Sequence, residues 1–295
     1  MQTLLAKFIH LPPIILTALV SASVSAQTPL IQQGRAAVNR GESAAAIEIL
    51  EKAVAQDPQS AEAHFALGLA YGSKGQQSGL LAAAKYGPKA KAELESAIAL
   101  NPKHVEARFG LVQFYAVAPG FMGGSLEKAL EQARELKAID PLAGHRASAF
   151  IYTQQKKPDL AKKEYLEAIR EQPNSAKAHT YFGQHLANVE KNYAAAFPQF
   201  EAALKLDPDH MPAVYHLGRV AALGNMSLSR GEEALKRYLA YTPKENEPPL
   251  ASAHYYLGVV YEKQGKKPEA RQSYQAALKL NPSHKQASEA LKRVS

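Results

Sequence analysis

The sequence lacks cysteine and tryptophan, and it has no long apolar run after its first 26 residues. Without cysteine the chain forms no disulfide framework, thiolate zinc site or iron–sulfur cluster, and it has no cysteine nucleophile or lipoprotein anchor. Without a later run of roughly 20 apolar residues, it has no candidate membrane span beyond the N-terminus. These absences exclude disulfide-stapled domains and multi-spanning membrane proteins.

What the sequence does contain is close to the average of globular proteins. Apolar residues make up 46% of the chain and charged residues 21%, which argues against disorder, collagen and a coiled coil. The 35 basic and 27 acidic residues give a formal charge of +8, which is mildly basic for 295 residues and does not by itself imply nucleic acid.

Residues 1–26 are typical of a secretory signal peptide. Lys7 supplies a positive charge, residues 14–20 form most of an apolar core, and small residues at Val24 and Ala26 precede Gln27. The alternative is a retained anchor, but Pro12 shortens the apolar run. We therefore expect cleavage after Ala26 and no stable membrane insertion afterwards. The mature chain is expected to be soluble, and periplasmic or secreted.

Internal repeats dominate the rest of the chain. Seven segments end in a proline: Pro58, Pro102, Pro141, Pro173, Pro208, Pro243 and Pro282. An alanine stands twelve residues before six of them: Ala46, Ala90, Ala129, Ala161, Ala196 and Ala270. Ala234 occupies the corresponding place in the remaining segment. Successive alanines are 44, 39, 32, 35, 38 and 36 residues apart, so the period is about 34 residues with insertions.

Each repeat contains two apolar patterns typical of amphipathic helices. In the clearest one, residues 251–261 predict a first helix and residues 268–280 a second helix that stops at Asn281 and Pro282. Gly258 is small at a place where two helices must approach closely. A lone pair of helices cannot bury both of its apolar faces, so the units must stack on one another.

This pattern resembles the tetratricopeptide repeat (TPR) family, with an exported bacterial character from the leader. The family has Leu-Gly at unit positions 7 and 8, Tyr at 11, Ala at 20 and 27, an aromatic residue at 24 and Pro at 32. The last unit matches with Leu257, Gly258, Tyr261, Ala270, Tyr274, Ala277 and Pro282. The third and sixth units are degenerate. Position 4 holds histidine rather than tryptophan in four units: His64, His145, His179 and His254.

The resemblance implies an all-α TPR solenoid, a right-handed superhelix of helix-turn-helix repeats closed by a C-terminal capping helix. We expect a signal peptide at 1–26, seven repeats over 27–282 and a capping helix at 283–295. The expected repeat ranges are 27–60, 61–104, 105–141, 142–175, 176–210, 211–250 and 251–282.

Insertions distinguish three of the repeats. They lie at 75–88, 118–125 and 224–229, and a further stretch, 245–249, separates the last two units. The first either lengthens a helix or adds a short one. The second is glycine-rich but lacks the ending of a phosphate loop, and its Ser125 is expected to cap the next helix. The insertions are interpreted either as partner-binding protrusions or clips, or as drift in solvated loops.

No motif for catalysis or cofactor binding is present. The sequence has no His-Glu-x-x-His, Gly-x-Ser-x-Gly or Gly-x-Gly-x-x-Gly. The position-4 histidines are expected to pack in place of an aromatic residue rather than bind metal. Basic runs are interrupted or flanked by acidic residues, which argues against nucleic acid. We expect no catalytic residue, no metal site and no cofactor.

In the TPR pattern, positions 2, 5, 9 and 12 of each first helix face the concave side. When positions 5 and 9 of the family pattern are matched to this sequence, they predict these groove residues: Phe65, Phe109, Gln113, Arg146, Phe150, Gln184, Tyr215, Arg219 and Tyr255. Aromatic rings supply contact area and arginine binds carboxylates, so the expected ligand is a protein segment with apolar anchors and an acidic group. In the alternative interpretation, the aromatic residues pack against neighbouring helices.

The expected function is therefore a non-enzymatic periplasmic scaffold that binds a peptide segment of a partner in this groove. A structural accessory subunit of an envelope enzyme or of a secretion or assembly complex is the alternative, and an enzyme comes third.

Overall fold

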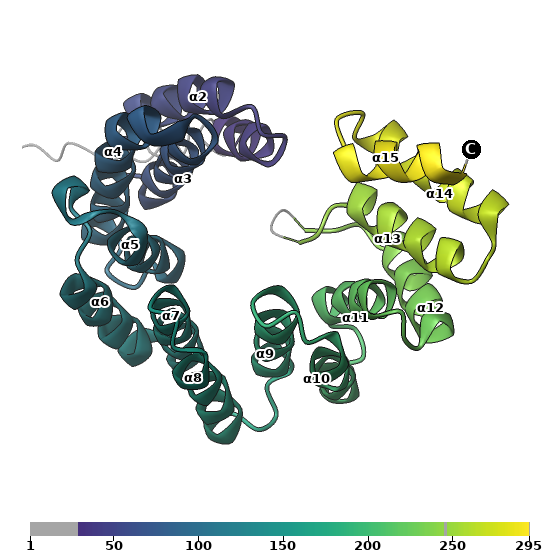
Figure 1. The fold of residues 1–295 in the computed structure, drawn as a ribbon. Helices are drawn as coiled ribbons and strands as arrows, with labels where there is room; N and C mark the ends of the chain where they lie inside the picture. Colours follow the sequence, from purple (N-terminus) through teal and green to yellow (C-terminus); the bar gives the residue numbers. More distant parts are fainter. Residues whose placement is uncertain (1–28, 245–246, 295) are drawn as a thin grey trace, which may run out of the picture. The chain divides into compact units, whose positions relative to one another are not determined.

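The computed structural model describes residues 29–244 and 247–294, and these residues form helices and no strand (Figure 1). The predicted signal peptide lies outside them. Residues 29–39 are helical, and the helices that follow are α2 (Ser43–Gln56), α3 (Ala61–Gln77), α4 (Gly79–Leu100), α5 (Val105–Val117), η1 (Gly120–Met122), α6 (Leu126–Ile139), α7 (Pro141–Gln154), α8 (Pro158–Glu171), α9 (Ala176–Asn188), α10 (Tyr193–Leu206), α11 (Met211–Gly224), α12 (Leu228–Leu239), α13 (Leu250–Lys263), α14 (Lys267–Leu280) and α15 (Lys285–Val294).

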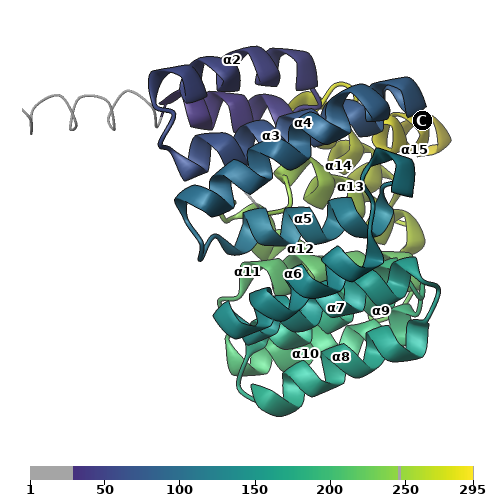
Figure 2. The same ribbon diagram turned by 90° about the vertical axis from the view of Figure 1, so that its left-hand side faces the viewer.

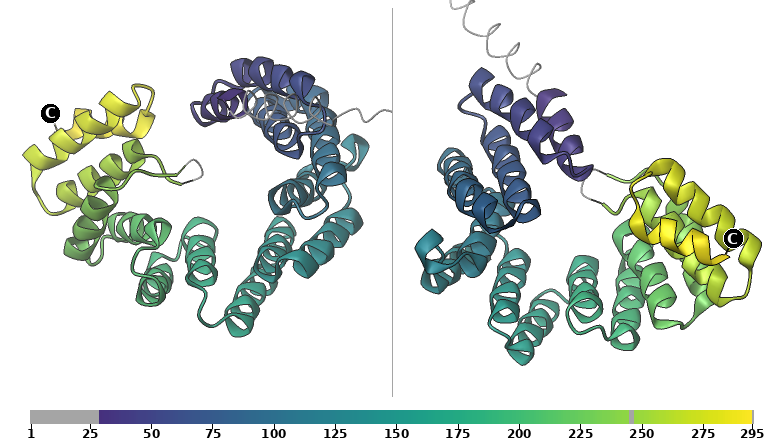
Figure 3. Two further views of the ribbon diagram at one scale, coloured as in Figure 1. Left: turned by 180° about the vertical axis from the view of Figure 1, so that it is seen from behind. Right: turned by 45° about the horizontal axis from the view of Figure 1, so that its top comes forward.

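The helices are arranged in consecutive pairs, which confirms the all-α repeat fold. The seven helix pairs run from residues 29–39 with α2 to α13 with α14 and follow the predicted ranges closely, except that α7 and α13 each begin one residue before their range. Partners such as α3 and α4, or α13 and α14, pack side by side, as Figure 3 shows from two further directions. Within the described ranges, no helix combines the length and the apolarity needed to cross a membrane.

The Asp-Pro and Asn-Pro pairs end helices by a shared local mechanism. Asp57 is the C-cap of α2 in an extended conformation, with φ −140° and ψ 92°. The following proline disfavours helical backbone at the residue before it. The Asp57 carboxylate then accepts the Gln59 N–H at 2.9 Å, and the side chains of Asn101, Asp207 and Asn281 accept in the same way two residues on. A short turn therefore leads into the next helix.

Glycine at unit position 8 lets the two helices of a pair approach closely. A Cβ atom built on Gly258 would lie 2.5 Å from Cε1 of Tyr274, which is the aromatic residue at position 24. A similar clash with a large residue of the second helix occurs at Gly34, Gly183 and Gly218, where the distances to Leu50, Phe200 and Leu235 are 2.3, 2.8 and 2.4 Å. The repeated Gly thus marks the contact between the first and second helix.

The insertions change the helices of the second and third units. In the second repeat both helices are longer and no extra helix forms. Helix α3 has 17 residues and α4 has 22, with Pro88 inside α4. In the third unit, 118–125 contains η1, which packs beside α4 (Figure 2). A Cβ atom on Gly124 would lie 1.7 Å from the Ala118 carbonyl oxygen, so glycine is required there. Ser125 Oγ accepts the Lys128 N–H at 3.3 Å, which confirms its capping role.

The chain divides into two compact units whose boundary falls between Gln132 and Ala133, inside α6. The second unit ends with α15, which packs against α14. Ala287, Ala290 and Val294 are its buried residues. The helix thereby covers the apolar side of the last repeat, as a capping helix does.

Candidate partner-binding surface

Three of the predicted residues link the first helices of the repeats in the second compact unit. Their side chains contact the next first helix along the series α7, α9, α11 and α13. The Arg146 guanidinium lies 4.9 Å from the ring centroid of Tyr181 on the next first helix. Gln184 Nε2 lies 2.7 Å from His216 Nε2, and Arg219 Nε donates to the Tyr256 hydroxyl at 3.2 Å. In each case the side chain reaches unit position 6 of the following repeat. We call this row of side chains the first-helix face.

A cavity of about 560 Å³ opens on this face between α9, α11 and the segment before α13. Its walls carry both signs of charge, hydrogen-bonding groups and two prolines: Lys177, Thr180, Tyr181, Gln184, His210, Pro212, His216, Glu247 and Pro248. Among the predicted groove residues, Gln184 lines it. A cavity of this size and mixed lining suits one or two side chains of a bound protein segment.

The electrostatics of the cavity centre on His216. Burial, and to a smaller extent the charge of Arg219, lowers the pKa of His216 to about 3, so the ring is neutral near pH 7. Its Nε2 atom is paired with Gln184, whereas its buried Nδ1 atom has no hydrogen-bond partner among the described residues. Burial also lowers the pKa of His210. A neutral imidazole with one unpartnered nitrogen therefore lies in the wall of the cavity.

Two of the predicted aromatic residues are packing residues instead. Phe65 is 8% exposed and its ring lies 4.8 Å from that of His104, and Tyr215 is 5% exposed with its ring 5.2 Å from that of Tyr238. Burial also raises the pKa of the Tyr215 hydroxyl. The alternative interpretation, that these aromatic residues pack against neighbouring helices, therefore describes this pair better.

The other predicted residues are at least partly accessible. Phe109 and Phe150 are half-buried and Gln113 is exposed. Tyr255 is half-buried, with its ring near those of Tyr274 and His284. Phe65, Phe109 and Gln113 belong to the first compact unit and the remaining predicted residues to the second.

Sequence reasoning missed the residues at unit position 6. Tyr181, His216 and Tyr256 receive the side chains of the preceding repeat, although the family pattern does not place them on the concave side. The available signal was the recurrence of an aromatic or imidazole ring at the same position in three successive units.

The segment between α12 and α13 is held against the first-helix face. The Tyr238 hydroxyl donates to the Pro248 carbonyl oxygen at 2.7 Å, and Glu247 accepts the Lys244 N–H at 2.9 Å. Glu247 and Pro248 also line the cavity. These contacts place Glu247 and Pro248 at the cavity, and the choice between a clip and drift in a solvated loop stays a prediction.

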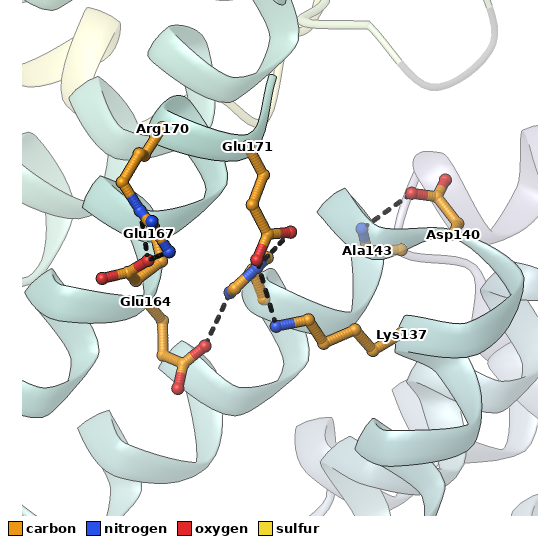
Figure 4. Close-up of polar contacts among 8 residues, drawn as sticks. Lys137, Asp140, Ala143, Glu164, Glu167, Arg170 and Glu171 are labelled. Carbon is orange, nitrogen blue, oxygen red and sulfur yellow. Dashed lines mark hydrogen bonds and ion pairs between the residues drawn. The ribbon is translucent and has the colours of Figure 1, made fainter. Parts of the chain in front are cut away.

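Three of the position-4 histidines, His64, His145 and His179, bond to the second helix of their pair, which agrees with the expected packing role. His64 Nδ1 lies 2.5 Å from Glu93, and His179 Nδ1 lies 2.9 Å from Gln199. His145 is buried between two carboxylates, 2.7 Å from Glu164 and 3.1 Å from Glu171. Figure 4 shows that the side chains of Glu164 and Glu171 both come from α8.

Glu171 has a second cationic neighbour. Lys137 Nζ lies 3.6 Å from its carboxylate (Figure 4). The hydrogen bond from His145 and, less strongly, the lysine charge lower the pKa of Glu171. The cluster is a charged contact among α6, α7 and α8 with all of its groups paired, so it has the character of a structural element.

Comparison with known proteins gives a consistent family assignment. Models of the tetratricopeptide repeat match residues 251–284, and two further TPR models match residues 34–75 and residues 80–143 with 151–210. No curated protein matches this chain.

Several solved structures are similar to this chain. A tetratricopeptide repeat protein from Parabacteroides merdae is 16% identical, with a TM-score of 0.48 over 92% of this chain and 99% of that one. The Cut9–Hcn1 hetero-tetramer of the APC/C is 18% identical with a TM-score of 0.51, and the IFIT1 monomeric mutant with Gppp-AAAA is 18% identical with a TM-score of 0.53. The Cut9–Hcn1 and IFIT1 matches each cover 86% of this chain, but they cover 46% and 58% of the matched chains, respectively.

These identities establish similarity of fold alone. The family models, in contrast, match the repeats themselves, and the helix pairs, position-8 glycines and capping helix agree with them. The chain belongs to the tetratricopeptide repeat family.

Proposed function

We propose that this protein is a non-enzymatic, exported adaptor that binds an extended or helical segment of a partner protein. The segment binds on the first-helix face of the second compact unit. TPR repeats are scaffolds for protein–protein interaction, and solenoids of this kind bind partners along the surface that their repeats share. The observation that carries the proposal is the cavity between α9, α11 and Pro248, because the repeat surface is hollowed there and a nitrogen of His216 in its wall has no hydrogen-bond partner among the described residues.

The chemistry of the face favours a partner segment with an acidic group. Lys177 is exposed at the rim of the cavity. Arg219 donates through Nε to Tyr256, whereas its Nη1 atom is buried without a hydrogen-bond partner among the described residues. A buried donor without an acceptor costs about 1–3 kcal/mol, so a carboxylate that reaches Arg219 recovers that cost on binding.

Capture of partners from envelope extract, followed by mass spectrometry, identifies the bound protein, and titration calorimetry with a peptide from it tests the site. We expect Gln184→Ala and Lys177→Glu to weaken binding, since both residues line the cavity. Lys163→Glu is the matched control, because Lys163 is an exposed lysine of the second helix α8 in the same unit.

Unchanged affinity in both cavity variants rejects this site. If the chain instead co-purifies stoichiometrically with one complex and the cavity variants leave that assembly intact, the protein is an accessory subunit rather than a peptide receptor. Turnover of a substrate by the purified chain contradicts the non-enzymatic part of the proposal.

The exported location is part of the proposal and rests on the N-terminal signal sequence. The mature protein is expected in the periplasmic fraction of a Gram-negative host with Gln27 as its first residue. Mass spectrometry of the intact protein tests this, and recovery of the uncleaved chain from the cytoplasm contradicts it.

A further inference from the structure

Two of the insertions meet on the first compact unit and expose large apolar side chains. Leu80 and Leu81 in the first turn of α4 are 69% and 88% exposed, and Phe121 in η1 is 84% exposed. The Phe114 ring joins the two insertions, because Cβ atoms built on Gly87 of α4 and on Gly123 after η1 would lie 3.5 and 3.8 Å from it. We call residues 79–91 together with 118–123 the insert lobe.

The exposed residues of α4 in this lobe form one continuous helical stripe. At 3.6 residues per turn, residues four apart share a face. The exposed positions are Leu80, Leu81, Ala84, Lys85, Pro88 and Lys89. The opposite side of the helix packs on α3, where the Tyr86 ring is stacked on that of Tyr71 at 6.0 Å. The leucines therefore point away from the repeat core and contribute nothing to its burial.

The lobe is positively charged and lacks acidic residues of its own. No Asp or Glu occurs from residue 63 to 92 or from residue 107 to 126. Lys85 and Lys89 flank the apolar stripe, with their Nζ atoms 5.3 and 5.2 Å from the ring centroids of Tyr86 and Tyr71. Glu51 accepts the Tyr71 hydroxyl at 2.6 Å beside these rings, and Lys91 at the end of the lobe is paired with Glu95 at 3.4 Å, so Lys85 and Lys89 are the lysines that carry the charge of the lobe.

The conformation of the η1 turn fixes Phe121 in its exposed position. Gly123 and Gly124 donate backbone hydrogen bonds to Gly120 and Pro119 at 3.0 and 3.1 Å, and Ser125 donates to the Tyr115 carbonyl at 2.9 Å. Gly123 has a φ of +92°, a conformation that suits glycine. A turn held by three backbone hydrogen bonds thus presents an aromatic side chain to solvent next to α4.

We propose that the insert lobe docks peripherally on an anionic lipid surface. Leucine and phenylalanine on a protruding face, bordered by lysines, match the interfacial region of a bilayer, where apolar side chains enter the acyl boundary and cations meet the headgroups. A protein partner of the same chemistry would need an acidic surface with an apolar pocket, whereas a bilayer supplies both features to a convex lobe. The inference is independent of the proposed peptide site, which lies in the other unit.

Co-sedimentation with unilamellar vesicles tests the proposal. We expect the protein to bind vesicles of phosphatidylcholine with phosphatidylglycerol, to bind pure phosphatidylcholine vesicles much more weakly, and to dissociate as salt is raised. The triple variant Leu80→Ser, Leu81→Ser, Phe121→Ser should bind about tenfold more weakly or worse, because three apolar anchors are lost. Lys85→Glu with Lys89→Glu should abolish the preference for anionic lipid.

The matched control is Leu166→Ser with Leu280→Ser, which removes exposed leucines from second helices of the other unit. It should leave vesicle binding unchanged. All variants carry the same N-terminus, so its own contribution to binding cancels, and circular dichroism melts verify that each is folded.

Three outcomes overturn the proposal: no binding of the unmodified protein to anionic vesicles, equal binding by the triple variant, or lobe variants that lose a co-purifying protein while vesicle binding is unchanged. The last outcome would assign the lobe to a protein partner instead.

Discussion

At the scale of single residues, the clearest departure from the family pattern is the histidine at unit position 4. An aromatic ring at this position needs only apolar neighbours, whereas imidazole must also satisfy its ring nitrogens. In three units the ring nitrogen meets a polar side chain at unit position 23: Glu93, Glu164 and Gln199. The histidine and its partner therefore act as a pair, and replacing one of them leaves the other without its hydrogen-bond partner.

The pair at His145 gives a direct stability test. Glu164→Ala leaves a buried ring nitrogen without its acceptor and should lower the free energy of unfolding by about 1–3 kcal/mol. Glu167→Ala, which removes an exposed ion pair with Arg170 on the same helix, should cost about 1 kcal/mol or less. Urea denaturation measures both, and equal losses contradict a structural role for the pair.

The neutral state of His216 predicts acid sensitivity. Its pKa is lowered to about 3 in the folded protein, from about 6.5 in an unfolded chain. Between these values the unfolded chain binds a proton that the folded chain does not, so the free energy of unfolding falls as pH falls from about 6.5 towards about 3. The loss should be steeper in the unmodified protein than in His216→Gln.

Denaturation at pH 7 and pH 5 measures this difference. His185, His210 and His254 also have lowered pKa values from burial, so the variant keeps part of the acid sensitivity. Identical losses in the variant and the unmodified protein contradict the assignment to His216.

At the scale of helices, the same few contacts are repeated and each has a local cause. The Asp or Asn before proline ends a second helix, and the position-8 glycine sets how closely the first helix approaches it. Where the chain departs from the 34-residue spacing, the helices themselves change length. The insertion in the second unit extends α3 and α4 beyond the repeat and creates the exposed stripe of the insert lobe.

The contact at Gly258 predicts a large packing penalty. A leucine there must displace the Tyr274 ring, which a Cβ atom would already approach to 2.5 Å, and overpacking of this kind costs about 1–3 kcal/mol or more. Lys266→Leu should lower the stability less. It still removes an ion pair, because Lys266 Nζ lies 3.2 Å from the Glu232 carboxylate. Lys279→Leu, at an exposed position of α14, is the cleaner control.

Thermal melts of the three variants rank these effects. The melting temperature should fall most for Gly258→Leu, slightly for Lys266→Leu and least for Lys279→Leu. Equal melting temperatures for Gly258→Leu and Lys279→Leu contradict the helix register described here.

At the scale of the whole molecule, the chain is a tandem of helix pairs in two compact units, and its surfaces have different chemistry. The first-helix face of the second unit is hollowed and polar, with arginines stacked on tyrosines, whereas the insert lobe of the first unit is convex, apolar and basic. Two such surfaces on one chain suit a protein that holds a partner segment while it rests on a second surface.

Removal of Arg146 and Arg219 tests the charged part of partner binding. We expect Arg146→Ala with Arg219→Ala to weaken partner capture and to flatten its salt dependence, because fewer ion pairs form. Both arginines stack on tyrosines, so the substitutions also cost about 0.5–1 kcal/mol of stability for each contact.

The control for this test is Arg170→Ala, at an exposed position of α8. It should leave capture unchanged. Unaltered affinity and salt dependence in the double arginine variant would mean that the partner carries no acidic group at this face.

The repeat, the helix pairs and their ends can be predicted from the residues alone, because these features depend on local chemistry: glycine where backbones approach, proline after Asp or Asn, and apolar positions at helical spacing. Only the tertiary structure decided which aromatic residues of the predicted groove remain accessible. Phe65 and Tyr215 hold the same unit position as Phe109 and Tyr255, yet the first two are buried by residues distant in sequence, such as His104 and Tyr238. Burial depends on which side chains the folded helices bring opposite one another, and the spacing of the motif positions does not contain that information.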